Sequence, residues 1–188
     1  MFLENVVFDA TDPRSLGRSW ESRLGTTTLT DVPEGFETRL ELPGWPYLDL
    51  CFQRVPEPPT GPERLRLDVD GDTGALAALV LESADPERDR AFWAWLTGWV
   101  PVEGRGAVLR HPSSNGPVLE LAPERAPKVD GKNRIHLDIR LEEEDPDEVA
   151  RAIADHGGRE LDLGYGELPW RHYADPSGNE LCVLVAHH

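Results

Sequence analysis

The sequence repeats itself, and this repeat limits the folds that the chain can adopt more than any other feature. An Asp-Pro pair at 12–13 and a tryptophan at 20 recur 73 residues later as Asp85, Pro86 and Trp93. Self-similarity at a fixed spacing indicates a supersecondary unit that is copied along the chain and stacks on its neighbours. We therefore expect an architecture built from copies of one unit.

Each copy begins with an apolar strand, at 5–8 and at 76–81, which leads into a helix start signal. Asp12 and Asp85 each precede a proline, and this pair favours a helix start because the carboxylate accepts a hydrogen bond from an otherwise unpaired amide. Gly25 and Gly98 suit left-handed C-caps. Three candidate strands follow each helix, at 26–29, 37–42 and 47–53 and then at 99–102, 107–110 and 118–121, which predicts β-α-β-β-β.

A third copy occupies the C-terminal part of the chain, and one strand is left without a unit of its own. RIHLDI at 134–139 leads through Asp145-Pro146 into a helix and then into strands at 159–162, 170–173 and 180–185. RLRLDV at 64–69 resembles that opening strand, but the next unit begins directly after it. We expect residues 1–74 to form one unit plus this extra strand, an incomplete half, and residues 75–188 to form a complete domain of two paired units.

The charge of the chain excludes several classes of partner. Lys and Arg number 19 against 35 Asp and Glu, and the resulting net charge of -16 repels nucleic-acid phosphates and anionic lipids. Residues 1–5 show neither a basic region nor a long apolar stretch, and no apolar run of about 18 residues occurs, so we expect a cytoplasmic protein that is neither secreted nor membrane-spanning. Cys51 and Cys182 are too few for a disulfide framework.

The C-terminal motif carries a resemblance to a known superfamily. Residues 168–184, LPWRHYADPSGNELCVL, contain an Asp-Pro-x-Gly-Asn turn before the last strand, and 133–139, NRIHLDI, opens the same unit. In this order they resemble the glyoxalase, bleomycin-resistance and extradiol-dioxygenase (vicinal oxygen chelate) superfamily, and in particular a glyoxalase-like subfamily that is widespread in actinobacteria. The resemblance implies an α+β fold in which paired βαβββ units form cupped mixed sheets, with helices on the outer face and a ligand or metal inside.

Strand alternation selects the residues that face such a cup. In 135–139 the odd positions are apolar and should face the helices, which leaves His136 and Asp138 on the opposite side. By the same parity Glu120 and Cys182 face inward. We predict that these four residues line a ligand-binding hollow in which Glu120 lies close to His136. His136 is then the candidate general base, because a neighbouring carboxylate raises the basicity of an imidazole.

Two further ligand-binding candidates lie on the strand that precedes the Asp-Pro-x-Gly-Asn turn. Trp170 and His172 share one face of this strand because side chains two positions apart along a strand point to the same side. Trp170 is suited to stack on a planar or cationic ligand, and a purely structural tryptophan is the alternative.

The resemblance also implies where a metal would bind. Metal-using relatives take ligands from the first and last strands of paired units, and Glu120 and His136 match two of these positions. The other two hold Ala78, which has no donor atom, and Cys182. The analogous places in the first copy hold Asn5, Asp49 and Arg66. Because one imidazole and one carboxylate make a weak site, we expect no cofactor to be required, with a divalent zinc, nickel, manganese or iron ion as the alternative.

Three functions remain open at this point. The first is a resistance-type protein that binds a small molecule in the cup without a metal, and the second is a metal-dependent lyase, isomerase or dioxygenase that uses Glu120 and His136. The third is a non-catalytic assembly module, because an odd number of units leaves one without a partner. That odd unit predicts either a homodimer in which residues 2–53 pair with their symmetry mate, or a fold in which this unit caps the complete pair.

Overall fold

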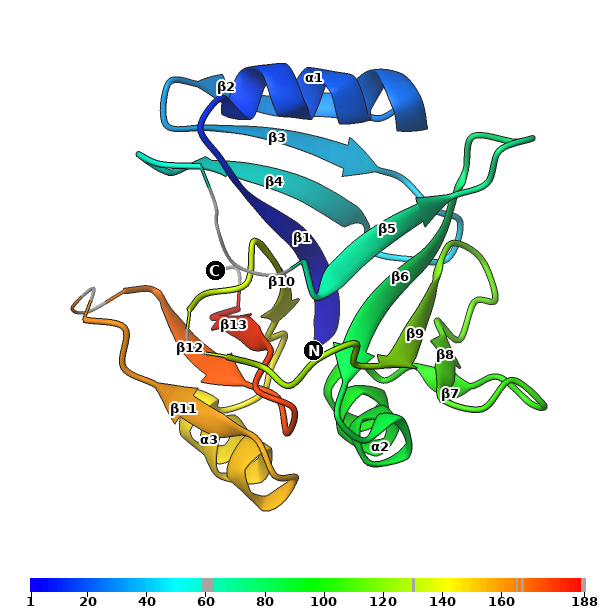
Figure 1. Cartoon of the computed structure of the whole chain (residues 1–188), viewed down its shortest axis with the longest axis vertical. Coiled ribbons are helices and arrows are strands. Elements are labelled where there is room, and N and C mark those ends of the chain that lie inside the picture. The colour runs from blue at the N-terminus through cyan, green and yellow to red at the C-terminus, as the bar shows by residue number, and fades with distance from the viewer. Residues whose placement is uncertain (59–62, 130, 165, 167, 187–188) are drawn as a thin grey trace.

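The computed structural model describes residues 1–58, 63–129, 131–164, 166 and 168–186, and within them the repeated unit is evident (Figure 1). The predicted α+β fold with βαβββ units is confirmed. The first unit contains β1 (Phe2–Ala10), α1 (Pro13–Leu24), β2 (Thr27–Val32), β3 (Gly35–Leu40) and β4 (Leu48–Arg54).

The single strand and the other two units follow in the predicted order. The extra strand is β5 (Leu65–Val69). The second unit contains β6 (Leu76–Ser83), α2 (Pro86–Thr97), β7 (Val100–Pro101), β8 (Val108–Arg110) and β9 (Val118–Pro123). The third contains β10 (Ile135–Arg140), α3 (Pro146–Asp155), β11 (Arg159–Leu161), β12 (Trp170–Ala174) and β13 (Glu180–Leu184).

The helices begin where the Asp-Pro pairs predict. The carboxylates of Asp12, Asp85 and Asp145 accept hydrogen bonds from backbone amides in the first turn, and a proline follows each cap. Gly25 and Gly98 end α1 and α2 with φ values of 66° and 70°, a conformation that glycine adopts without steric strain. Each helix that the structure describes is too short or too polar to span a bilayer.

The pairing of the units differs from the expectation. An eight-stranded sheet has the order β11-β12-β13-β10-β1-β4-β3-β2, so the first unit pairs with the third. Its centre is the antiparallel pair of β1 and β10, in which Val7 lies opposite His136 and Asn5 lies opposite Asp138. The expectation that the second and third units share a sheet is therefore wrong, and residues 1–74 and 75–188 do not form separate sheets.

The second unit forms a smaller sheet with the extra strand. This sheet has the order β5-β6-β9-β8-β7, and β5 pairs antiparallel with β6 just as β10 pairs with β1. Arg66 lies opposite Val80, the position that His136 takes opposite Val7 in the first sheet. β5 thus occupies the place of the first strand of a unit whose remaining elements are missing. The first unit already has a partner inside the chain, so the original reason to expect a homodimer no longer applies.

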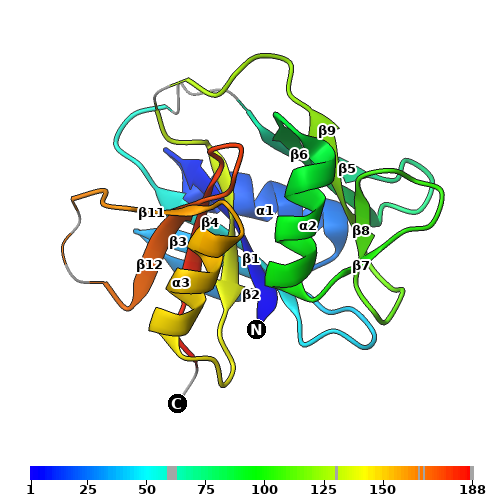
Figure 2. The same ribbon diagram turned by 90° about the horizontal axis from the view of Figure 1, so that it is seen from below.

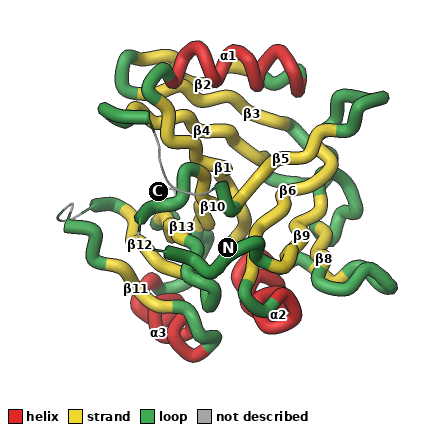
Figure 3. Tube along the Cα trace, in the orientation of Figure 1, coloured by secondary structure: helices red, strands yellow, loops and turns green. Residues whose placement is uncertain are grey.

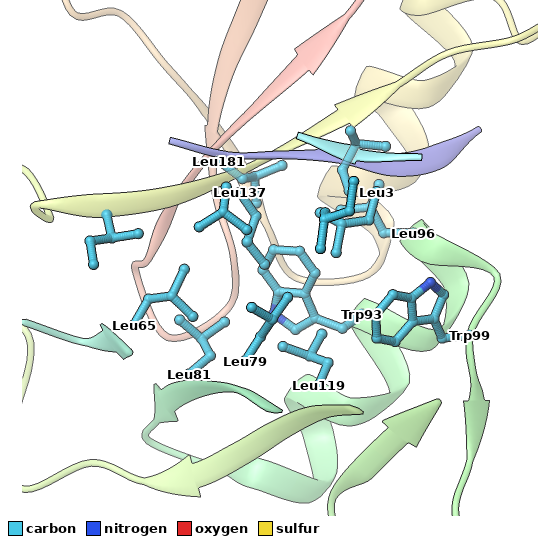
Figure 4. Packing of buried hydrophobic residues seen from close by; sticks show 14 of the residues in the cluster. Leu3, Leu65, Leu79, Leu81, Trp93, Leu96, Trp99, Leu119, Leu137 and Leu181 are labelled. Carbon is cyan, nitrogen blue, oxygen red and sulfur yellow. The ribbon is translucent and has the colours of Figure 1, made fainter. Parts of the chain in front are cut away.

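The two sheets pack back to back, with helices outside and between them. α1 lies on the half of the first sheet that contains β3 and β4, and α3 lies beside β11 (Figures 2 and 3). α2 contacts β1 of the first sheet as well as β6 and β9 of the second. Its Trp93 is buried between Leu79 and Leu119 on one side and Leu137 and Leu181 on the other (Figure 4). One hydrophobic core therefore joins both sheets.

The Asp-Pro-x-Gly-Asn turn, between β12 and β13, forms a polar joint beside this core. Asp175 Oδ1 accepts hydrogen bonds from the amides of Ser177 and Asn179, and Oδ2 accepts them from Trp93 Nε1 and Asn179 Nδ2. The buried Arg64 donates to Asn179 Oδ1 from the segment before β5. Burial raises the pKa of Asp175 to about 6, although these N–H donors act in the opposite direction. The motif that suggested the family is therefore a structural joint between the sheets.

Candidate functional site

The first sheet curls around a hollow of about 950 Å³. Its floor is made by the inward faces of the four central strands, β4, β1, β10 and β13, and its walls come from β2, β3, β12 and the loop before β12. The odd-numbered side chains of β10 pack in the core, and the even-numbered ones face the hollow, so the predicted orientation of this strand is confirmed. This size suits a small organic molecule, since ligand pockets usually enclose about 300 to 1,000 Å³.

A cluster of polar side chains lies at the centre of the floor. It consists of Asn5 on β1, His136 and Asp138 on β10, and Cys182 on β13, and each is less than 9% exposed. Asn5 Nδ2 donates to Asp138 Oδ2 over 3.2 Å, and His136 Nε2 lies 3.3 Å from Asp138 Oδ1. Strand pairing produces this cluster, because Asn5 and Cys182 are the cross-strand neighbours of Asp138 on its two sides.

Several polar atoms of this cluster have no hydrogen-bond partner. Within the described part of the chain, Asn5 Oδ1, His136 Nδ1 and Asp138 Oδ1 are buried and unpaired. The contact of His136 Nε2 with Asp138 Oδ1 is close, but it lacks the alignment of a hydrogen bond. Buried polar groups in native proteins are nearly always paired, and an unpaired one costs about 1–3 kcal/mol. The floor therefore offers unpaired polar atoms to whatever enters the hollow, whether water or a ligand.

The two thiols of the hollow are not activated as nucleophiles. Burial and the neighbouring Asp138 carboxylate raise the pKa of Cys182. Burial and the Glu37 carboxylate also raise the pKa of Cys51, whose Sγ donates a hydrogen bond to Glu37 Oε1. Reactive cysteines have lowered pKa values and positively charged surroundings, so both thiols stay protonated at neutral pH.

Several exposed apolar side chains lie at the mouth of the hollow. Val32, Leu163, Trp170 and Val185 line it, and they make up half of the eight large apolar side chains that the described chain exposes. Trp170 Nε1 donates to His172 Nε2 over 3.3 Å, and burial lowers the pKa of His172, which keeps this nitrogen available as an acceptor. The predicted proximity of Trp170 and His172 to the cup is thus confirmed, and their role in binding stays a prediction. Apolar side chains gathered at one opening indicate a binding site.

Glu120 lies elsewhere, and its predicted proximity to His136 is wrong. It belongs to β9 of the second sheet, where its cross-strand neighbours are Val80 and Val108, and it does not line the hollow. The prediction that Glu120 points away from the core side of β9 is right, but β9 belongs to the second sheet, so Glu120 faces away from the hollow of the first sheet. The metal site composed of Glu120 and His136 therefore does not form.

A different set of donors could be reached by a metal ion. His136, Asp138 and Cys182 each offer one ligand atom, and these atoms all lie within 4.8 Å of one another. An imidazole, a carboxylate and a thiolate are ligands that zinc accepts, with three protein ligands and one open position typical of a catalytic site. The unpaired Asp138 Oδ1 fits such a role. The raised pKa of Cys182 opposes it, because a metal would have to displace the thiol proton.

Sequence reasoning underestimated the contribution of the first unit. Asn5 had been placed at an analogous ligand position, and it does lie in the floor of the hollow. Asp49 is instead held by Arg39, whose Nε and Nη2 donate over 2.8 and 2.7 Å, and Arg66 lies on the second sheet. Glu37 and Cys51 of the hollow were not singled out. The alternation of polar and apolar residues in 48–54 was the signal available for Cys51.

A comparison with protein families gives two matches that together cover nearly the whole chain. A family model described as a glyoxalase-like domain matches residues 5–80 and again residues 78–184. The two matches meet at β6, the first strand of the second unit. No curated protein matches the chain.

Solved structures with similar architecture have low sequence identity to this chain. Glyoxalase I from Zea mays is 16% identical with a TM-score of 0.40, and the match covers 98% of this chain and 68% of that one. Methylmalonyl-CoA epimerase from Mycobacterium tuberculosis is 13% identical with a TM-score of 0.42, and the match covers 100% of this chain and 89% of the epimerase. A Bacillus subtilis protein named as a dioxygenase candidate is 14% identical with a TM-score of 0.42. That match covers the whole of this chain, which spans only 63% of the length of the Bacillus subtilis protein.

Proposed function

Because the chain belongs to the glyoxalase-like domain family, we propose that the hollow of its first sheet binds a small organic molecule, as a resistance-type binding protein does. The observation that carries this proposal is the set of buried, unpaired polar atoms of Asn5, His136 and Asp138 at the floor. A hollow of about 950 Å³ with a few polar groups at its base and apolar walls has the composition of a ligand pocket.

Thermal denaturation in the presence of a compound library tests this proposal. A ligand at about 100 times its Kd adds roughly 2.7 kcal/mol to the free energy of unfolding, so binders raise the Tm. We expect hits whose effect is lost in Asp138→Leu and retained in Glu120→Gln, the matched control on the second sheet. Hits that depend equally on Glu120, or a complete absence of hits over a chemically diverse library, would contradict binding in this hollow.

A metal-dependent lyase, isomerase or dioxygenase is the second candidate function, and the grouping of His136, Asp138 and Cys182 favours it. When bound there, a divalent ion would act as a Lewis acid toward oxygen atoms of a substrate. Other side chains of the hollow would hold and orient the substrate, and His136, whose ring nitrogen would be bound to the ion, is a candidate general base only when no metal is bound.

Titration of chelator-treated protein with cobalt(II) separates this candidate from the first. Coordination by Cys182 would produce a thiolate-to-cobalt absorption band that Cys182→Ser removes and Cys51→Ser, the matched control, leaves in place. If no such band forms and metal content stays far below one ion per chain, the binding protein without a metal is the better description.

A further inference from the structure

The unpaired oxygen atoms at the floor of the hollow are hydrogen-bond acceptors. Asn5 Nδ2 donates to Asp138 Oδ2, and this contact orients the amide, because a reversed amide would place its oxygen against the carboxylate. The remaining oxygens, Asn5 Oδ1 and Asp138 Oδ1, are both buried and both unpaired. A guest that satisfies them must donate hydrogen bonds.

The charge of Asp138 is also not balanced by the cations around the hollow. Lys132, Arg54 and Arg140 line it, but each is engaged elsewhere. Lys132 Nζ lies 2.9 and 3.1 Å from the two carboxylate oxygens of Asp9, and Arg140 donates to Glu4 and to the carbonyl of Val185.

Arg54, the third of these cations, is held at the rim by backbone groups. Its Nε and Nη1 donate to the carbonyl oxygens of Pro33 and Thr11. A buried carboxylate without a cation is costly, and a positively charged guest would remove that cost. The imidazole of His136 also lies beside Asp138, with Nε2 3.3 Å from Oδ1, but an ordinary imidazole carries no charge at pH 8.5.

Other carboxylates extend the negative charge from the floor toward the mouth. Glu37 lies on β3 in the wall and accepts hydrogen bonds from the Thr30 hydroxyl and the Cys51 thiol, and no cation in the described chain forms an ion pair with it. Glu34 is exposed at the mouth. With a net charge of -16 over the whole chain, the electrostatic field attracts cations and repels anions. The apolar residues at the mouth add a surface for an apolar body.

We infer that the guest of this hollow is an amphipathic cation, an ammonium or amidinium group on an apolar body. Its charged end would donate to Asp138 Oδ1 and Asn5 Oδ1, and its apolar part would lie along the walls toward Trp170. This inference rests on the proposed function, since it specifies the chemistry of the molecule that the hollow binds.

Three probes with one apolar body and different head groups test the inference by isothermal titration calorimetry: 4-phenylbutylamine, 4-phenylbutan-1-ol and 4-phenylbutyrate. At pH 8.5 an ordinary primary amine is still charged and an ordinary imidazole is neutral, so binding of the amine must rely on the carboxylate. We expect the amine to bind at least about tenfold more tightly than the alcohol, because its ammonium group forms an ion pair with the carboxylate as well as a hydrogen bond. The acid should bind least, because its carboxylate is repelled by Asp138.

Two variants and a control link this preference to the floor. Asp138→Asn keeps the shape and removes the charge, so the preference for the amine should disappear. Asn5→Asp adds a second carboxylate, so the preference should increase, which keeps the test decisive if Asp138→Asn folds poorly. Asp68→Asn changes the equivalent residue of the second sheet and should leave all three affinities unchanged.

The outcomes separate this inference from the proposed function. If the alcohol or the acid binds as tightly as the amine, or if the preference survives Asp138→Asn, the guest is not a cation, while binding in the hollow stands. If none of the probes binds and no library compound of any charge raises the Tm, both the cationic guest and the binding function are overturned.

Discussion

The two sheets of this protein hold equivalent pairs of polar residues in the same register and give them different surroundings. His136 and Asp138 lie opposite Val7 and Asn5 in the first sheet, and Arg66 and Asp68 lie opposite Val80 and Ala78 in the second. His136 and Asp138 are less than 10% exposed. The side chains of Arg66 and Asp68 are 50% exposed and form an ion pair of 3.3 Å with each other.

The difference shows that the second half of the cup, rather than the strand itself, creates the site. In the first sheet a complete unit on each side of the central pair encloses the polar groups and removes them from water. In the second sheet β5 stands alone, and the inward face carries a small apolar cluster around Ala78, Val80, Val108 and Val118. A charged pair that water can solvate contributes little to stability and needs no ligand. An enclosed carboxylate with an unpaired oxygen is costly, and a ligand that pairs it lowers that cost.

The largest expected effect concerns the core that joins the sheets. Trp93→Ala removes a fully buried indole and its hydrogen bond to Asp175, so we expect a loss of about 3–5 kcal/mol in the free energy of unfolding. Urea denaturation followed by circular dichroism and by tryptophan fluorescence measures this loss. Both signals should change together in the wild type. Separate transitions would mean that the second sheet unfolds independently, contrary to a shared core.

The next effect concerns the pH dependence of the polar joint. The pKa of Asp175 is raised from 3.8 to about 6 in the folded state, so its contribution to stability is fully present below about pH 4 and is lost as the pH rises through about 6. This contribution is on the order of 3 kcal/mol. We therefore expect the stability difference between wild type and Asp175→Asn to shrink between pH 4 and pH 7 in urea titrations. A difference that grows over this range would reverse the assignment.

A smaller effect, a gain in stability rather than a loss, is expected at Asp138 and not at its counterpart Asp68. Without ligand, Asp138→Asn should stabilise the protein by about 1–3 kcal/mol, because it neutralises a buried carboxylate that has one unpaired oxygen and no cation beside it. Asp68→Asn should change the free energy of unfolding by less than about 0.5 kcal/mol, since that side chain is solvated. Urea denaturation of the wild type and both variants measures these changes in the free energy of unfolding. Destabilisation by Asp138→Asn would mean that His136 already compensates its charge in the empty hollow.

The smallest effect concerns the two thiols, both of which lie in the first sheet. Because burial raises the pKa of Cys51 and of Cys182, we expect alkylation by iodoacetamide at pH 8 to be much slower in the folded protein than in urea. Mass spectrometry of time points measures both sites. A ligand in the hollow should slow both further. Rapid alkylation of Cys182 in the native state would show that its surroundings favour the thiolate.

Local sequence signals were sufficient for the units themselves. The Asp-Pro caps before α1, α2 and α3 determine where helices begin, because the side-chain bond to a first-turn amide involves only neighbouring residues. Alternation in 135–139 correctly predicted that His136 and Asp138 face away from the core, since the pleat of a strand is a local property. The resemblance of 64–69 to 134–139 likewise identified β5 as an opening strand.

Only the tertiary structure decided which units share a sheet, and with it which polar groups share a hollow. By its apolar pattern alone, β10 could pair equally well with the opening strand of either other unit, β1 or β6. The observed pairing shows that its partner is β1. Pairing across the whole chain depends on how α2 and the core fill the space between the sheets, and no local window contains that information. For this reason the sequence predicts Glu120 as the carboxylate beside His136, whereas the structure places Asp138 there, with Asn5 as its hydrogen-bond donor.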